Sequence, residues 1–161
     1  MTPEEEVLQE KLAEQGKMMY QNFMGRTIDI LDRMKDRFGP EVSNVVDDMV
    51  GERTLQQWKH IAQSEESHDI ADLIRVLWEP LKARGFEYTT EEREDGVQIY
   101  CTKCALYDLA KEINGTEWMF HLNCGTDPHI VAGFNPEIKF NRTKTLMEGD
   151  DCCDHFYGYP D

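Results

Sequence analysis

The sequence predicts an α+β protein in which N-terminal helices pack on a small antiparallel sheet, with further helices inserted between the C-terminal strands. Two observations support this. Up to Gly85 apolar residues recur at helical spacing, whereas beyond it short β-rich runs alternate with turn signals and short helical segments. The 161 residues suit a single domain, with a helical half at 1–85 and a mixed half at 86–161.

The first predicted helix begins at a capping box, Thr2-Pro3-Glu4-Glu5, with proline at its first position. Apolar residues then follow at spacings of three, four or their sum, which predicts one continuous stripe. The members of this stripe are Met19, Phe23, Ile30, Met34 and Phe38. Gly39-Pro40 ends the helix and starts the next one.

Three more helical segments are predicted before Gly85. The inner face of the first consists of Val42, Val45, Val46 and Met49. Thr54-Leu55-Gln56-Gln57 resembles another capping box, which would start a new helix leading to Trp58. After a polar break at 64–67, a strongly amphipathic helix runs over 70–81, with Pro80 shortening its last turn and Gly85 closing it.

The mixed half begins with a predicted hairpin. Phe86–Thr89 and Val97–Tyr100 are β-rich runs joined by Glu94-Asp95-Gly96. The elements expected after it are helices at 104–113 and 116–123, a helix opened by Asp127-Pro128, a strand over 137–147, a turn at 148–151 and a last segment at 152–159.

Composition narrows the function classes. With 32 acidic and 17 basic residues, the formal charge of -15 repels nucleic-acid phosphates and anionic membrane surfaces, so neither is expected as a partner. The N-terminal residues carry no signal-peptide pattern, and no run approaches the ~20 apolar residues that span a bilayer. Five cysteines without a signal sequence favour reduced thiols and a cytoplasmic protein.

All five cysteines lie between Cys101 and Cys153, so any thiol chemistry belongs to the mixed half. Cys101-Thr102-Lys103-Cys104 has the spacing of a metal or redox pair, but no second such pair exists. The alternative is structural: Cys101 continues the apolar face of the preceding strand, and Cys104 starts a helix.

A second candidate is Cys124-Gly125-Thr126-Asp127, where a thiol and a carboxylate three positions apart precede a helix. Such a pair can converge on one substrate, the carboxylate moving protons and the thiolate attacking carbon. The competing interpretation makes Asp127 the N-cap of the helix that Pro128 opens, with no chemical role.

The third candidate is Arg142, in a locally cationic run of an acidic chain, where it is suited to hold a small carboxylate through two parallel hydrogen bonds. The alternative is a solvated strand end. None of the histidines belongs to a zinc motif, and no nucleophile elbow, phosphate loop or dinucleotide fingerprint occurs.

Combined in order, these motifs resemble the L-2-amino-thiazoline-4-carboxylic acid hydrolase family over roughly residues 97–157. The resemblance rests on C-x-x-D, a proline, R-T-x-T-L, G-D and C-D, together with an upstream cysteine and glutamate. The matching residues are Cys104, Glu117, Cys124, Asp127, Pro136, Arg142–Leu146, Gly149-Asp150 and Cys153-Asp154. The chain departs from the family at His155, where an aromatic residue usually follows the C-D pair, and Cys101 and Cys152 are additional.

The resemblance implies hydrolytic opening of a cyclic amidine, converting L-2-amino-thiazoline-4-carboxylate to N-carbamoyl-L-cysteine. The expected catalytic residues are Cys124, Asp127 and Cys153; the expected substrate-binding residues are Arg142, Cys104, Glu117 and Asp150. Either a Cys124 thiolate or a water activated by Asp127 would attack the ring carbon. No cofactor is required.

Three alternatives remain open from the sequence. Cys104, Cys124 and Cys153 would bind zinc if a metal is present. The cysteine pattern is also similar to the 4-vinyl reductase domain, which implies a small-molecule-binding protein with an apolar pocket lined by methionine and tryptophan. An acidic protein–protein adaptor is the third. The expected partner is a small-molecule substrate, and the sequence fixes neither the oligomeric state nor which of Cys152 and Cys153 faces the site.

Overall fold

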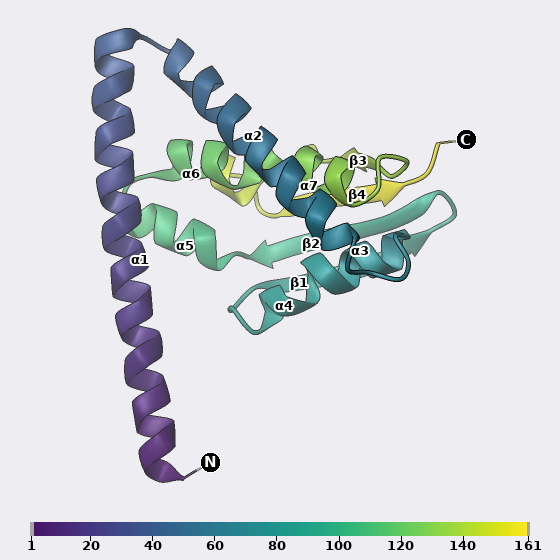
Figure 1. The fold of residues 1–161 in the computed structure, drawn as a ribbon, viewed down its shortest axis with the longest axis horizontal. Coiled ribbons are helices and arrows are strands. Elements are labelled where there is room, and N and C mark those ends of the chain that lie inside the picture. Colours follow the sequence, from purple (N-terminus) through teal and green to yellow (C-terminus); the bar gives the residue numbers. More distant parts are fainter. Residues whose placement is uncertain (1, 161) are drawn as a thin grey trace. The chain divides into compact units, whose positions relative to one another are not determined.

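The computed structural model describes residues 2–160 and has the α+β architecture that the sequence predicts (Figure 1). The chain divides between Val42 and Ser43 into two compact units. The first contains α1 (Pro3–Phe38), and the second contains the sheet and the helices from α2 (Glu41–Ala62) onward, apart from the first two residues of α2. The division lies within the segment 1–85 that the sequence predicts to be helical.

The predicted capping box of α1 is confirmed. The Thr2 side chain accepts a hydrogen bond from the Glu5 backbone at 3.3 Å, and the Glu5 carboxylate accepts one from the Thr2 backbone at 2.7 Å. The helix ends at Gly39. Its φ of 88° is a backbone conformation that glycine adopts easily and residues with a side chain adopt only under strain. The predicted stripe lies on this helix with every side chain exposed: Met19, Phe23, Ile30, Met34 and Phe38.

Helix α2 corrects two sequence predictions. Residues 41–62 form one continuous helix, so the expected new start at Thr54 is wrong. The capping pattern has no effect here because helical structure continues on both sides of it and the later turns anchor in the core through Trp58 and Ala62. The predicted inner face is also partly wrong, since Val45 and Met49 are exposed while Val46 is buried.

The amphipathic segment at 70–81 forms two helices, α3 (Ile70–Leu77) and α4 (Glu79–Lys82). Asp69 caps α3 by accepting a hydrogen bond from the Asp72 backbone at 2.9 Å. The interruption at Trp78 lies two residues before Pro80, which has no N–H to donate to the preceding helical turn. Gly85 follows with the expected positive φ of 86°.

The sheet is antiparallel throughout, with strand order β1-β2-β4-β3. Its strands are β1 (Glu87–Arg93), β2 (Gly96–Lys103), β3 (Lys139–Asn141) and β4 (Cys153–Gly158). The predicted hairpin is confirmed as β1–β2. In the register of β2 and β4, Ile99 pairs with His155 and Cys101 with Cys153, which puts these four side chains on one face.

Short helical segments connect the strands of the C-terminal part. They are α5 (Ala105–Glu112), α6 (Thr116–Leu122), the 3₁₀ turns η1 (Cys124–Thr126) and η2 (Leu146–Glu148), and α7 (Asp127–Phe134). Helix α7 packs closely on α2: a Cβ added at Gly133 would lie 2.8 Å from both the Leu55 carbonyl oxygen and the Trp58 Cβ. Because Gly133 has no side chain, α7 and α2 can pack in close contact next to the sheet.

The long strand expected over 137–147 is wrong, because β3 stops at Asn141. Beyond it, the backbone N–H groups donate to carboxylates instead of a neighbouring strand. Asp154 accepts from the Thr143 and Lys144 backbones at 2.7 and 2.6 Å, and Asp150 accepts from the Thr145 backbone at 2.8 Å.

The main core of the second unit lies between one sheet face and helices α2, α3 and α7. Trp58, Leu73 and Phe134 come from the helices, and Ile99 and Tyr157 from the strands. Within the described residues, no helix has the length and apolar character needed to cross a membrane.

Candidate active site

A cavity of about 440 Å³ opens beside this core, within the second unit. Helices α2, α3 and α7 and strands β2 and β4 all contribute to its wall. Five of the residues predicted for the site line it: Cys104, Cys124, Asp127, Arg142 and Cys153. The structure therefore brings together thiols, a carboxylate and a guanidinium that are separated by up to fifty positions in the sequence.

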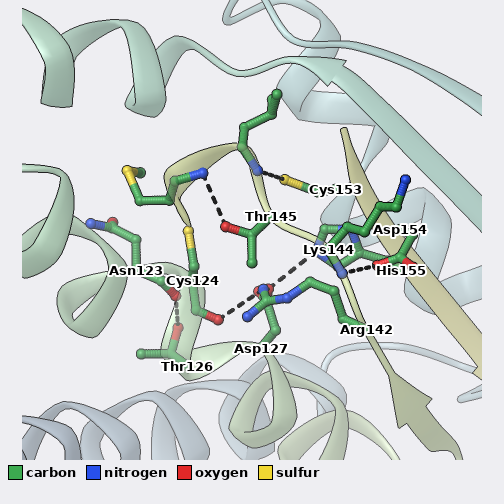
Figure 2. Close-up of polar contacts among 12 residues, drawn as sticks. Asn123, Cys124, Thr126, Asp127, Arg142, Lys144, Thr145, Cys153, Asp154 and His155 are labelled. Atoms are coloured by element: carbon green, nitrogen blue, oxygen red, sulfur yellow. Dashed lines mark hydrogen bonds and ion pairs between the residues drawn. The ribbon is translucent and has the colours of Figure 1, made fainter. Parts of the chain in front are cut away.

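Asp127 is the central charged group of the cavity. It is the first residue of α7, whose N-cap is Thr126, and its carboxylate makes no capping hydrogen bond. The N-cap interpretation is therefore wrong. Instead, Asp127 Oδ2 accepts hydrogen bonds from Arg142 Nη1 and pairs with His155 Nε2 at 3.2 Å (Figure 2). Both contacts fall on the same carboxylate oxygen, Oδ2.

Arg142 is held in place from several sides, and its side chain is only 10% exposed. Nη1 donates to the Cys124 carbonyl oxygen at 3.1 Å as well as to Asp127. The guanidinium also lies 5.6 Å from the ring centre of Phe120 and 6.0 Å from that of Phe140. Both of these hydrogen bonds come from Nη1. The Nε and Nη2 groups therefore remain to donate to a carboxylate.

His155 is the site residue that sequence analysis missed. It lines the cavity, its side chain is 8% exposed, and its Nδ1 is buried with no hydrogen-bond partner among the described residues. The rings of Trp78 and Phe140 pack against it at centroid distances of 4.9 and 5.8 Å. Its position two residues after Cys153 was the available signal, because alternate strand residues share a face.

Four thiols line the cavity, and all have raised pKa values. Burial raises the pKa of Cys101 to about 12 and that of Cys153 to about 11. Burial, with a smaller effect of the Asp127 charge, raises the pKa of Cys124 further. Burial also raises the pKa of Cys104. These thiols are therefore protonated at neutral pH.

The raised thiol pKa values predict alkaline destabilisation. Between the unperturbed pKa of 9.0 and about 12 for Cys101 or about 11 for Cys153, the folded chain holds protons that the unfolded chain has lost. The free energy of unfolding should therefore fall as pH rises through that window, by up to about 1.4 kcal/mol per pH unit for each thiol. Urea unfolding of Cys101→Val across the window should give a shallower slope than the wild type. An unchanged slope would contradict the assignment.

The Cys124 sulfur points away from the charged pair, toward the loop that carries Thr145 (Figure 2). On the other side of this loop, the Leu146 backbone donates to the Cys153 sulfur at 3.3 Å. Cys152, by contrast, does not line the cavity, so Cys153 is the member of the adjacent pair that faces it.

Two predicted substrate-binding residues lie outside the cavity wall. Glu117 is exposed on α6, and Asp150 is exposed with its carboxylate bound to the Thr145 backbone. Asp150 belongs with Asp154, whose carboxylate binds the Thr143 backbone and hydroxyl and the Lys144 backbone. The G-D and C-D elements thus shape the loop between Arg142 and Cys153.

Removing the Asp154 carboxylate tests this structural role. Asp154→Ala leaves three donors of the loop without their acceptor, and we expect the free energy of unfolding to fall by about 1–3 kcal/mol. Asp151→Ala is the matched control, because the exposed Asp151 side chain pairs with Lys144 at the surface and its loss should destabilise the fold far less. Equal losses in urea unfolding of the two variants would refute the role.

Metal binding by the three predicted thiols has no geometric support. Across residues 2–160, no group of three or more His, Cys, Asp or Glu side chains is arranged to hold a metal ion. The apolar part of the cavity wall includes Trp58 and Trp78, as a binding pocket lined by tryptophan would require, but no methionine.

A cavity on one face of an antiparallel sheet, with a carboxylate, an imidazole and a guanidinium paired in its wall, has the groups that proton transfer to a small molecule requires. Comparison with known families is consistent with this kind of site. Residues 15–157 match the L-2-amino-thiazoline-4-carboxylic acid hydrolase family, and the chain belongs to it. The match extends through most of α1 and so beyond the residues that carry the motifs. No curated protein and no solved structure gives a significant match.

Proposed function

We propose that this cavity binds a small cyclic amidine bearing a carboxylate and opens its ring by addition of water. L-2-amino-thiazoline-4-carboxylate, the compound in the family's name, is the simplest example. One observation carries the proposal: the Asp127 carboxylate lies in the cavity wall, and Arg142 and His155 both contact its Oδ2. We assign the second oxygen, Oδ1, to the ligand.

In this proposal Arg142 orients the substrate. Its Nε and Nη2 groups donate two parallel hydrogen bonds to the substrate carboxylate, the geometry in which arginine binds carboxylates most strongly. Nη1 remains bound to Asp127 and the Cys124 carbonyl, so the guanidinium does not have to move. A fixed cation beside a fixed carboxylate places the amidine carbon next to Asp127.

Asp127 acts as the acid–base group in this mechanism. Oδ1 removes a proton from water as the water oxygen bonds to the amidine carbon between sulfur and nitrogen. The bond from that carbon to sulfur then breaks and sulfur takes the proton from Asp127. The proton on the added oxygen passes to the ring nitrogen, and the carbon becomes a carbonyl. The product is N-carbamoyl-L-cysteine, with its ring nitrogen retained and no change in oxidation state. Positioned proton transfer of this kind contributes about 10²–10⁴-fold to a rate.

The cysteines distinguish this mechanism from covalent catalysis. Because burial raises the pKa of Cys124, a resting thiolate is disfavoured, and we expect Cys124→Ser to reduce kcat/KM less than about tenfold, well short of the effect of losing a general base. Steady-state kinetics of this variant checks the expectation. A loss of 10²-fold or more, with substrate affinity retained, would instead indicate attack by the Cys124 thiolate.

The proposal is tested by incubating the full chain with L-2-amino-thiazoline-4-carboxylate and related cyclic amidine acids, with and without chelator. Product is followed by liquid chromatography and mass spectrometry, which avoids interference from the protein's own thiols. We expect saturable formation of the N-carbamoyl product, unaffected by chelator. Binding without turnover of any compound would contradict hydrolysis and favour a small-molecule-binding protein. Activity lost on chelation would favour a metal site.

A further inference from the structure

We propose that the substrate of this site carries an apolar substituent in addition to its carboxylate and amidine groups. The inference rests on the proposed function for the polar end of the ligand. It adds a second recognition element, which is the apolar wall of the same cavity. The wall consists of Trp58, Leu77, Trp78, Leu81, Phe86 and Ile130.

The apolar wall starts at the polar cluster. The Trp78 ring lies 4.9 Å from the His155 ring, which in turn contacts Asp127. Trp78 is itself fixed, since its Nε1 donates to the Tyr157 hydroxyl at 3.0 Å and the Tyr88 ring packs against it at 5.0 Å. A fixed aromatic ring in the cavity wall is therefore separated from Asp127 by one side chain, His155.

The exposure of the wall distinguishes it from ordinary core. Leu77, Leu81, Phe86 and Ile130 are only partly buried, although they are packed against the buried cluster. All four also line the cavity. Contact with an apolar group would remove this surface from water, and each buried methylene group is worth about a fourfold gain in affinity.

The size of the cavity supports the same conclusion. A volume of about 440 Å³ lies in the range of roughly 300–1,000 Å³ that encloses drug-sized ligands. A five-membered ring with one carboxylate and one amino group is far smaller than such a ligand. Bound at Arg142 and Asp127 alone, it would leave the surface of Leu81 and Phe86 without an apolar partner.

Two series of 2-amino-thiazoline-4-carboxylates test the inference, one alkylated at ring carbon 5 and the other at the exocyclic nitrogen, with hydrogen, methyl, propyl or butyl groups. Affinity is measured by calorimetry with the wild-type chain, and hydrolysis of each compound is measured separately. In at least one series we expect the dissociation constant to fall by at least tenfold from hydrogen to butyl. Affinities that are flat or weaken along both series would overturn the inference.

A variant pair locates the effect. Leu81→Asn introduces a polar group into the wall and should remove most of the dependence on chain length. Val45→Asn, at an exposed position outside the cavity wall, should retain it. A dependence unchanged in Leu81→Asn would overturn the proposed role of this wall. If affinity rises along a series but no compound is hydrolysed, the proposed hydrolysis fails while the apolar recognition stands.

Discussion

Replacing Asp127 with asparagine is expected to lower kcat/KM for thiazoline opening by about 10²–10⁴-fold, the contribution of a positioned general base. An amide cannot accept the proton of the attacking water, although it fills the same space. It also changes the hydrogen bond to His155, because an amide nitrogen can donate where the carboxylate only accepts. Initial rates of product formation over a range of substrate concentrations measure the effect.

A matched control separates this loss of chemistry from a loss of structure. Asp47→Asn removes another carboxylate that pairs with a histidine, His121, at a distance of 2.8 Å, but Asp47 does not line the cavity. This variant should keep nearly full activity. Comparable activity of Asp127→Asn and the wild type would show that Asp127 is not the base.

The largest expected effect on stability comes from separating Arg142 and Asp127. Their side chains are only 10% and 19% exposed, so Arg142→Met leaves a carboxylate in a poorly solvated place without its cation. Breaking a buried ion pair in this way costs about 3–5 kcal/mol of unfolding free energy, more than the pair itself contributes. Urea unfolding of the purified variant checks the value.

The double variant completes the test. Arg142→Met combined with Asp127→Asn removes both charges, and replacing a buried pair by groups of similar volume is often close to neutral. We therefore expect the double variant to recover most of the stability lost by Arg142→Met alone. If the two substitutions are simply additive, the pair is not coupled in the folded protein.

The helices were the most predictable part of the fold, because their signals are local. The capping box at Thr2 and the positive φ at Gly85 follow from residues within one turn, and the hairpin follows from its Glu94-Asp95-Gly96 signal. The same kind of local signal failed at Thr54. A capping pattern describes what can start a helix, but it does not show that a longer helix already includes those residues.

The misassigned strand at 137–147 has a different cause. Its alternating pattern is real, but only residues 139–141 pair with β4. Beyond them, the backbone N–H groups of Thr143, Lys144 and Thr145 donate to the carboxylates of Asp154 and Asp150. An alternating pattern within one segment does not show that its backbone will bond to side chains from a later part of the chain. In this family motif, the conspicuous acidic residues prove to shape a loop.

The sequence identified most residues of the candidate site, but it predicted the role of only some of them. The motif order brought Cys124, Asp127, Arg142 and Cys153 into consideration, and all four line one cavity. What the sequence could not provide was the pairing of Asp127 with Arg142, fifteen residues on, and with His155, twenty-eight residues on. Those contacts exclude the capping role and set the orientation of the carboxylate.

Burial likewise changed the expected chemistry of the thiols. In the sequence, a cysteine just before a helix suggests a lowered pKa and a reactive thiolate. In the folded protein, removal of Cys124 from water outweighs this effect and raises its pKa. Solvent exclusion depends on the whole fold around the cavity, so no local pattern could have revealed it.

The most direct measurement is the quenched time course of N-carbamoyl-L-cysteine formation from L-2-amino-thiazoline-4-carboxylate, combined with the intact mass of the protein at each time point. We expect product to accumulate while the protein mass stays unmodified, because water adds to the ring carbon directly with Asp127 as base. A protein mass increased by a bound fragment of substrate during turnover, or product formation at the wild-type rate by Asp127→Asn, would contradict the account.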